Sequence, residues 1–273
     1  MPECSHNCES CELAGSCDSK ITKAKLNDRS KIKKIIGVLS GKGGVGKSYI
    51  TSLLAVYLNR QGYKVGILDA DITGPSIPKA FGIKDKAYGE DNLIYPLVSN
   101  GGIKLISANC LLENDSDPIV WRGPLLGGLI KQFYEDVLWE ELDYLLIDMP
   151  PGTGDVALTV FQQLPVDDLI IVTSPQDLVS LIVTKAIKMA NMMNIKVLGV
   201  IENMSYLVCP DCGKKINLFG ESHLEEFAKE MNFDILAKLP LVSENTVLVD
   251  NGKVEQVVLN EILPAVDAIK KEK

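Results

Sequence analysis

The sequence predicts an α/β protein whose doubly wound, mainly parallel sheet carries helices on both faces. Short apolar runs alternate with segments of helical periodicity along most of the chain, which is the order of elements in such folds. Residues 64–69 and 143–148 are almost continuously apolar, as parallel strands are when both faces are covered. A glycine-rich turn at residues 41–48 joins the first strand to the first helix. Because such sheets bind ligands at the carboxyl ends of their strands, this turn marks the expected site.

Each element rests on its own pattern, since short apolar runs predict strands and apolar positions three and four apart predict helices. The predicted strands are residues 35–40, 64–69, 143–148, 169–173, 197–201 and 235–239. The predicted helices are residues 49–61, 122–142, 155–164, 177–194 and 220–231, followed by two helical pieces in 244–271 that break around Gly252 and Pro264. Residues 93–98 and 103–108 form a weaker extended pair, and the turn residues 100–102 between them indicate a hairpin.

The first 30 residues differ from the rest of the chain. They are polar, and they contain Cys4, Cys8, Cys11 and Cys17 among Ser, Asn, Glu, Asp and Gly. Such a composition cannot bury a core, so we expect a flexible cysteine-rich segment over residues 1–30 and one domain over residues 31–273. The cysteines give this segment its evident reason to become ordered, which would be the binding of a metal species.

Composition argues against several classes of protein. The 273 residues are 46% hydrophobic, enough for a sizeable core, and carry a formal net charge of −8. An acidic chain is poorly suited to broad binding of a nucleic-acid backbone, and no apolar run approaches the roughly 18 residues of a membrane span. The polar N-terminus does not resemble a signal peptide. We therefore expect a cytoplasmic protein with no nucleic-acid or membrane partner, whose seven cysteines are thiols or metal ligands rather than disulfides.

The glycine-rich turn reads G-K-G-G-V-G-K-S and has the form of a phosphate-binding loop. Glycines let successive backbone N–H groups point at a triphosphate, and the free N–H groups at the start of the next helix add to the attraction. We expect Lys47 to neutralise the β- and γ-phosphates and Ser48 to offer its hydroxyl to Mg²⁺. The residues expected to bind the nucleotide here are Gly41, Lys42, Gly43, Gly44, Val45, Gly46, Lys47 and Ser48.

Carboxylates follow two of the predicted strands. Asp69-Ala70-Asp71 ends the second strand, and Asp148 ends a later one. Asp148 is placed to hold Mg²⁺ through water, and the glycines in residues 149–155 would let the following loop contact a γ-phosphate through its backbone. An acidic residue at a strand end is often only a turn former, but its combination with a phosphate-binding loop favours phosphoryl-transfer chemistry.

The expected base is adenine. The Asn/Thr-Lys-x-Asp motif that GTP-binding proteins of this type usually carry does not occur in the sequence. Asn203 is predicted to end its strand, and its amide can both donate to and accept from the adenine edge. Residues 31–273 are therefore expected to form a P-loop ATPase domain that uses ATP and Mg²⁺.

A second kind of site is expected at Cys209-Pro210-Asp211-Cys212. Two thiolates at this spacing can bind zinc or an iron–sulfur cluster, but both usually require four protein ligands. The nearest further candidate is His223, and Cys110 is far away in the sequence. A redox disulfide is an alternative, although the pair is predicted in a loop rather than at a helix start. A symmetric dimer would supply the missing two thiolates.

The phosphate-binding loop resembles the variant loop of the dimerising ATPases that include MinD, ParA and the nitrogenase iron protein. The likeness rests on Lys42, a second lysine directly after the first glycine. The resemblance implies that Lys42 crosses the dimer interface to the partner's nucleotide, and that Asp71 helps to activate water. It also supports Asn203 as an adenine ligand. The implied catalytic residues are Lys42, Lys47, Asp71 and Asp148.

The complete set of motifs resembles the Mrp/ApbC/Nbp-type iron–sulfur cluster carrier ATPases. The motifs are G-K-G-G-V-G-K-S, L-D-A-D-I-T-G-P-S, W-R-G-P at residues 121–124, D-M-P-P-G-T-G-D, I-E-N-M-S and C-P-D-C, and the likeness spans about residues 33–270. It implies a homodimer that binds a [4Fe–4S] cluster through Cys209 and Cys212 of both subunits. It further implies slow Mg²⁺-dependent ATP hydrolysis and transfer of the cluster to apo iron–sulfur proteins.

Two questions stay open at this point. Cys8, Cys11 and Cys17 resemble the end of the cysteine signature of the eukaryotic-type carriers, but the further upstream cysteine of that signature has no place here, and Cys4 is the substitute. A second cluster, zinc and plain thiols are all compatible with these residues. For the whole chain, a MinD/ParA-like positioning ATPase and an iron-protein-like reductase are the competing functions.

Overall fold

The computed structural model describes residues 23–71, 76–111, 123–175, 179–220 and 222–271. Its strands are β1 (Lys31–Ser40), β2 (Val65–Asp69), β3 (Tyr88–Glu90), β4 (Leu93–Tyr95), β5 (Leu97–Val98), β6 (Lys104–Ser107), β7 (Glu141–Asp148), β8 (Asp168–Thr173), β9 (Lys196–Val208), β10 (Lys215–Ile216) and β11 (Ile235–Pro240). Its helices are α1 (Lys47–Arg60), α2 (Ile77–Ala80), α3 (Gly123–Glu135), α4 (Asp155–Gln163), α5 (Val179–Met192), α6 (Leu224–Met231), α7 (Ser243–Asp250) and α8 (Leu263–Lys270).

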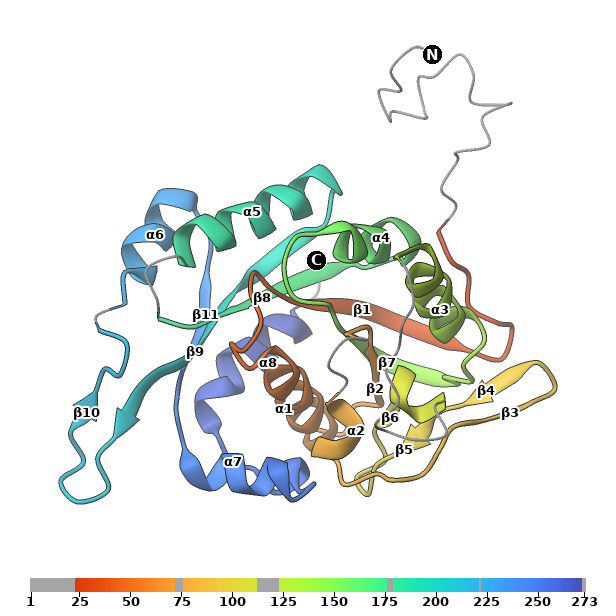
Figure 1. Ribbon diagram of the computed structural model, residues 1–273, viewed down its shortest axis with the longest axis horizontal. Coiled ribbons are helices and arrows are strands. Elements are labelled where there is room, and N and C mark those ends of the chain that lie inside the picture. Colours follow the sequence, from red (N-terminus) through yellow and green to blue (C-terminus); the bar gives the residue numbers. More distant parts are fainter. Residues whose placement is uncertain (1–22, 72–75, 112–122, 176–178, 221, 272–273) are drawn as a thin grey trace, which may run out of the picture.

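The central sheet is mainly parallel, as predicted. Its strands follow the order β10-β9-β8-β1-β7-β2-β6-β5, with β11 paired to β9. Only the pairs β5–β6 and β9–β10 of this sheet are antiparallel among the described strands. In Figure 1, α3, α4, α5 and α6 lie over one face of the sheet, and α1, α2, α7 and α8 lie over the other. The doubly wound α/β fold expected from the sequence is therefore confirmed, and β1, which leads into the glycine-rich turn, lies in the middle of the sheet.

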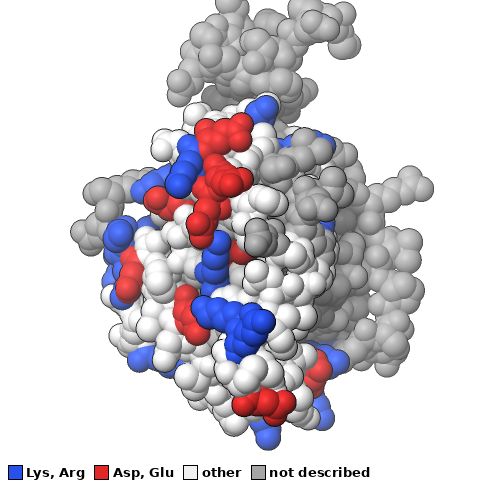
Figure 2. All heavy atoms as spheres, turned by 90° about the vertical axis from the view of Figure 1, so that its left-hand side faces the viewer, with Lys and Arg blue, Asp and Glu red and all other residues white. Residues whose placement is uncertain are grey.

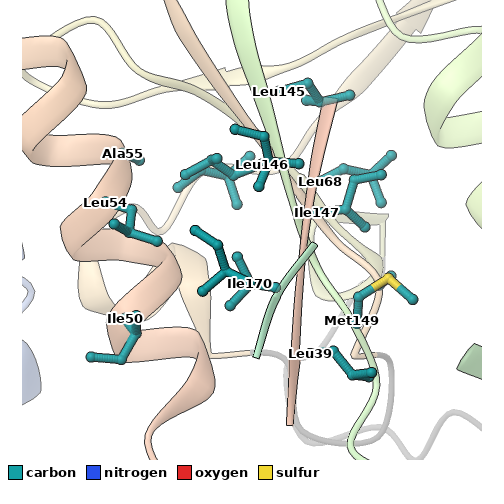
Figure 3. Packing of buried hydrophobic residues seen from close by; sticks show 14 of the residues in the cluster. Leu39, Ile50, Leu54, Ala55, Leu68, Leu145, Leu146, Ile147, Met149 and Ile170 are labelled. Atoms are coloured by element: carbon teal, nitrogen blue, oxygen red, sulfur yellow. The ribbon is translucent and has the colours of Figure 1, made fainter. Parts of the chain in front are cut away.

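The core fixes the position of the helix that follows this turn. Figure 3 shows Ile50 and Leu54 of α1 facing Leu146 of β7 and Ile170 of β8. All four side chains are completely buried. A leucine or isoleucine that leaves water in this way contributes about 1.5–3 kcal/mol. The packing therefore holds α1, and with it the glycine-rich turn, against the ends of the central strands.

The predicted hairpin is confirmed in part, because residues 97–98 pair with β6 whereas residues 93–95 form the separate strand β4, and the structure adds β3 and α2. β5 and β6 pair antiparallel, with Leu97 opposite Leu105. A second hairpin, formed by β3 and β4, precedes them in the chain. The short helix α2 also lies in this part of the chain, close to α1 and α7. These pieces are only three or four residues long, so they have too little periodicity to be predicted.

The predicted helix over 122–142 is wrong at its C-terminal end. Helix α3 ends at Glu135, and residue 122 lies outside the described part of the chain. The buried side chains of Val137 and Trp139 belong to an extended link, and the ring N–H of Trp139 donates to the carbonyl of Phe133. Glu140 then takes a left-handed φ of 54° and β7 begins at the next residue. The residues of this link are apolar because they are buried, and their spacing in the sequence resembles that of a helix.

The two C-terminal helical pieces and the break around Gly252 and Pro264 are confirmed, because α7 ends at Asp250 and α8 begins at Leu263. Pro264 lies in the first turn of α8, where the missing N–H of a proline has no intrahelical partner to lose. Between the two helices, short 3₁₀ turns occupy residues 254–256 and 260–262. By contrast, the helix that was predicted to begin at about Gly220 begins at Leu224.

The strand that was predicted to end at Asn203 continues to Val208. β9 pairs with β11 as far as Tyr206, and then with β10 at Leu207 and Val208. The polar residues of I-E-N-M-S concealed this extension, because a buried strand is expected to be apolar. The extended β9 places Cys209 directly after the strand that contains Asn203.

The described end of the N-terminal region lies against the domain. The N–H of Ala24 donates to the carbonyl of Gln163 over 2.7 Å, and the amide of Asn27 donates to the carbonyls of Glu135 and Val137. Cys4, Cys8, Cys11 and Cys17 lie outside the described residues, so their role and the division at residue 30 stay predictions. No helix within the described ranges is long and apolar enough to cross a membrane.

Candidate functional site

The glycine-rich turn connects the carboxyl end of β1 to the start of α1, as predicted. Gly44 and Gly46 have φ angles of 80° and 82°, in the left-handed region that side chains disfavour. Gly46 is also the N-cap of α1, so the free N–H groups of the helix follow directly. Gly41 is required for another reason, because a Cβ there would stand 1.4 Å from a methyl group of Ile182. The local backbone thus has the form that a phosphate requires.

Two acidic strand ends meet this turn. The ammonium nitrogen of Lys47 lies 3.0 Å from Oδ2 of Asp148 and 3.4 Å from Oδ2 of Asp71. The hydroxyl of Ser48 donates to Oδ2 of Asp148 over 2.5 Å. The structure therefore brings Lys47, Ser48, Asp71 and Asp148 together, although they come from three separate parts of the sequence. Hydroxyl and carboxylate oxygens are the ligands that Mg²⁺ takes, so Ser48 and Asp148 fit a magnesium ion.

The structure adds two side chains that were not assigned a role from the sequence. Thr51 donates to the second oxygen of Asp148 over 2.8 Å. Asp69 is buried and stands opposite Asp148 in the pairing of β2 with β7. Thr51 could have been found from its spacing, because it lies one helical turn after Lys47. Asp69 precedes Asp71 by two residues, and its role depends on the register of two strands, which the sequence does not show.

Burial dominates the electrostatics of these carboxylates. It raises the pKa of Asp148, while the Lys47 charge and the hydrogen bond from Ser48 act in the opposite direction. Burial, followed by the charge of Asp148, raises the pKa of Asp69 well above its ordinary range. A buried carboxylate is stable only when it is paired or hydrogen-bonded. The positive charge of Lys47 therefore compensates the negative charge of the carboxylates at the ends of β2 and β7.

A cavity of about 420 Å³ lies over the turn. Its walls include Gly44, Lys47, Asp71 and Pro151. The last of these belongs to the loop after β7 that was predicted to contact a γ-phosphate, so that loop borders the same space. Tyr49 also lines the cavity and was not predicted to take part.

Asn203 holds the turn rather than ending a strand. Its Nδ2 donates to the carbonyl of Val45 over 3.0 Å. A Cβ on Gly46 would stand 2.3 Å from this nitrogen and 3.7 Å from Cε of Met204. The two side chains therefore lie directly against the glycine at the start of α1. The contact with adenine that was predicted for Asn203 stays a prediction.

Lys42 belongs to the same turn and is half-buried. Its carbonyl accepts a hydrogen bond from the hydroxyl of Ser40 over 3.0 Å. The carboxylates near the turn, Asp71 and Asp148, form ion pairs with Lys47. Within the described ranges, no ion pair joins a carboxylate to the ammonium group of Lys42. The contact of Lys42 with the nucleotide of a partner subunit stays a prediction.

The C-P-D-C sequence forms the turn of the β9–β10 hairpin. The N–H of Cys209 donates to the carbonyl of Lys214, and the N–H of Gly213 donates to the carbonyl of Cys209, both over 2.9 Å. Cys209 is half-buried, Cys212 is exposed, and both thiols are free. Hydrogen bonds from the backbone of Cys212 and Asp211 lower the pKa of the Cys209 thiol. They therefore favour the thiolate, which is the form that binds metals.

The other candidate ligands lie elsewhere. Cys110 is buried in the 3₁₀ turn after β6, and the exposed His223 lies near Glu226. In the part of the chain that the structure describes, no three His, Cys, Asp or Glu side chains gather into a metal site. Residues 72–75 and 121–122, which belong to two of the quoted motifs, fall outside the described ranges.

Comparison with known proteins adds independent evidence. Residues 31–271 match the family model described as ParA, NUBPL iron-transfer P-loop NTPase. An iron–sulfur cluster carrier protein from Clostridium perfringens is 47% identical over 259 residues, which are 92% of this chain and 91% of the relative. Another from Methanocaldococcus jannaschii is 48% identical over 249 residues, which are 88% of this chain and 86% of the relative.

Solved structures agree with this assignment. A nucleotide-binding protein from Archaeoglobus fulgidus, in complex with ADP, is 45% identical with a TM-score of 0.75, and the match covers 82% of this chain and 88% of that one. The cell division ATPase MinD of Pyrococcus furiosus has a TM-score of 0.62 at 20% identity over 87% of this chain and 98% of its own, which is a likeness of fold alone. The resemblance inferred from the motifs is confirmed. The chain belongs to the family of nucleotide-binding, iron-transfer P-loop NTPases that includes the iron–sulfur cluster carrier proteins.

Proposed function

We propose that this protein hydrolyses ATP and carries a [4Fe–4S] cluster, which it binds between two copies of the chain and transfers to apo iron–sulfur proteins. The observation that carries the proposal is the course of β9. Asn203 of this strand contacts the phosphate-binding loop, and Cys209 follows the end of the same strand. The description of the relatives as cluster carriers supports the same function.

The residues around Lys47 account for hydrolysis. Phosphoryl transfer depends almost entirely on positioning and on stabilisation of charge. The loop N–H groups would orient the phosphates, and Lys47 would meet the charge that develops on the γ-phosphate. Asp71 lines the same cavity 3.4 Å from Lys47 and would orient the attacking water. Ser48 and Asp148 would hold Mg²⁺, which would neutralise charge between the β- and γ-phosphates.

ATP is the proposed nucleotide. The relative from Archaeoglobus fulgidus is a complex with ADP, which supports adenine as the base. The amide of Asn203 holds Val45 through its nitrogen, and its oxygen is an acceptor of the kind that the amino group of adenine requires. Turnover is expected to be slow, as the family resemblance implies. Preferential binding of GTP over ATP would contradict the role given to Asn203.

The cluster is assigned to Cys209 and Cys212 of two subunits. One hairpin presents two thiols, whereas a cubane cluster is held by four cysteines. A two-fold axis supplies the second pair without further sequence. The hairpin and the residues just after it also expose the apolar side chains of Val208, Ile216 and Phe219, which a second copy would cover. Figure 2 views the side of the molecule where β10 lies in Figure 1 and shows basic and acidic residues interspersed among uncharged surface.

Lys42→Ala is expected to separate binding from hydrolysis. If Lys42 contacts the phosphates bound by the partner subunit, its removal leaves the subunit's own loop intact but removes a cation from the transition state. We expect ATP to bind with nearly unchanged affinity, while turnover falls by about a hundredfold, which is typical for the loss of one stabilising group. The measurements are a nucleotide titration and a steady-state ATPase assay.

The matched control is Lys64→Ala, which removes an exposed lysine that pairs with Glu141 away from the turn. This variant should retain full turnover. The role given to Lys42 would be excluded if its variant kept wild-type turnover. It would also be excluded if light scattering found only monomers in every nucleotide and cluster state.

Transfer distinguishes the proposal from its two competitors. A positioning ATPase of the MinD/ParA type has no use for this pair of free thiols, and a reductase would retain its cluster through redox cycles. Cluster-loaded protein should therefore restore the activity of an apo [4Fe–4S] enzyme under anaerobic conditions, with loss of its own cluster. Retention of the cluster during repeated reduction and oxidation, without recovery of the enzyme, would favour the reductase.

A further inference from the structure

We propose that Glu202 is a positioning residue that couples the nucleotide site to the thiol pair. The inference rests on the proposed function, because it concerns the communication between the two sites of that function. Glu202 lies on β9 directly before Asn203, and only 1% of its surface is exposed. A carboxylate in such a place must have partners for its oxygens. Those partners come from both sides of the cysteine hairpin.

The outgoing and returning segments of the hairpin meet at this carboxylate. Ser205, on β9, donates to Oε2 of Glu202 over 2.6 Å. Ser222, which precedes α6, donates to the other oxygen, Oε1. The hydroxyl oxygen of Ser222 in turn accepts a hydrogen bond from the N–H of Leu224, so the start of α6 belongs to the same hydrogen-bond network. One buried side chain therefore connects the two ends of the segment that contains Cys209 and Cys212.

The strand bends next to this connection. Met204 has a left-handed φ of 57°, although it is not a glycine, and the pairing of β9 with β11 changes register between Lys238 and Pro240. The bend faces the phosphate-binding loop, because Asn203 and Met204 both lie against Gly46. A change in the loop when phosphates bind would therefore act directly on the bend.

The connection determines what the bend can move. From Met204 the strand continues to Val208 without another left-handed residue, and an extended chain rises about 3.3 Å per residue. With Ser205 and Ser222 both held by Glu202, a rotation at the bend turns the hairpin as one piece. Without the hydrogen bond to Ser222, the returning segment is free to move separately from β9, and a rotation at the bend leaves the thiols in their original orientation. Glu202 thereby links the loop at Gly46 to the orientation of Cys209 and Cys212.

Ser222→Ala tests this link without altering β9 or the phosphate-binding loop. The rate at which iodoacetamide alkylates Cys209 and Cys212 is measured on the full, reduced, cluster-free chain, with and without Mg·ATP, and mass spectrometry of peptides separates these thiols from the others. In the wild type, ATP should change the rate by about fivefold or more, the lower end of typical coupling between sites. In Ser222→Ala the ratio should fall to about one, with ATP affinity and turnover unchanged.

Two further variants separate coupling from loss of stability. Ser222→Thr keeps the hydroxyl and should restore the response, whereas Ser99→Ala removes another serine–carboxylate bond, to Glu255, and should leave the response intact. The proposal is overturned if Ser222→Ala responds like the wild type, if Ser99→Ala loses the response equally, or if the wild type shows none. A failure of the proposed function would appear elsewhere, as wild-type protein that binds no cluster.

Discussion

Replacement of Lys47 by alanine should reduce ATP hydrolysis by two to three orders of magnitude or more, the usual cost of removing one group that stabilises the transition state (about 10²–10³). Lys47 is 5% exposed and contacts both Asp71 and Asp148, so it is fixed against the strand ends that border the cavity. Its ammonium group is the positive charge expected to meet the γ-phosphate. A steady-state ATPase assay measures the loss.

The same substitution has a second consequence, because Lys47 also neutralises buried carboxylates. Breaking a buried ion pair by removing one partner costs about 3–5 kcal/mol. A thermal unfolding curve must therefore accompany the assay. Lys34→Ala is the matched control, since Lys34 lies near the start of β1 and pairs over 2.8 Å with the buried Asp168. It should lower stability but keep turnover. Wild-type turnover in Lys47→Ala would contradict the assignment of the site.

Cys209→Ala and Cys212→Ala should each abolish cluster binding. Each change removes two of the four thiolates at a two-fold interface, and a cubane with two protein ligands is not retained. The phosphate-binding loop is untouched, so ATP affinity should stay at the wild-type value. Iron and sulfide are measured after anaerobic reconstitution, in a background where Cys4, Cys8, Cys11 and Cys17 are serine.

Cys110→Ala serves as the control, because Cys110 is buried away from the hairpin and should not affect cluster content. Full retention of iron and sulfide in Cys209→Ala or Cys212→Ala would exclude the pair as the ligands. Zinc accepts the same four-thiolate cage, so zinc is measured in the same samples. Zinc in place of iron after purification and reconstitution would contradict the cluster.

Much of the architecture was predictable because its signals are local. The apolar runs that became β2 and β7 and the eight residues of the phosphate-binding loop are contiguous, and their neighbours determine their conformation. The end of α3 was not predictable. The residues after it, including Trp139, are apolar because of tertiary burial, and this looks like helical spacing in the sequence.

The site was predictable in its members but not in its contacts. Lys47, Ser48, Asp71 and Asp148 could be named from strand ends and a motif. The approach of Asp69 to Asp148 depends on the pairing of β2 with β7, and the contact of Asn203 with Val45 depends on where β9 crosses the loop. Glu202 was hidden for the same reason, because its partner Ser222 is twenty residues away in sequence.

The most direct test of the carrier function is anaerobic native mass spectrometry of the reconstituted protein in which Cys4, Cys8, Cys11 and Cys17 are replaced by serine. The proposed function predicts a species of two chains with about four irons and four sulfides, as one cubane cluster requires. The same species should be lost in Cys212→Ala. A metal-bearing single chain, or a dimer that carries zinc and no sulfide, would contradict it.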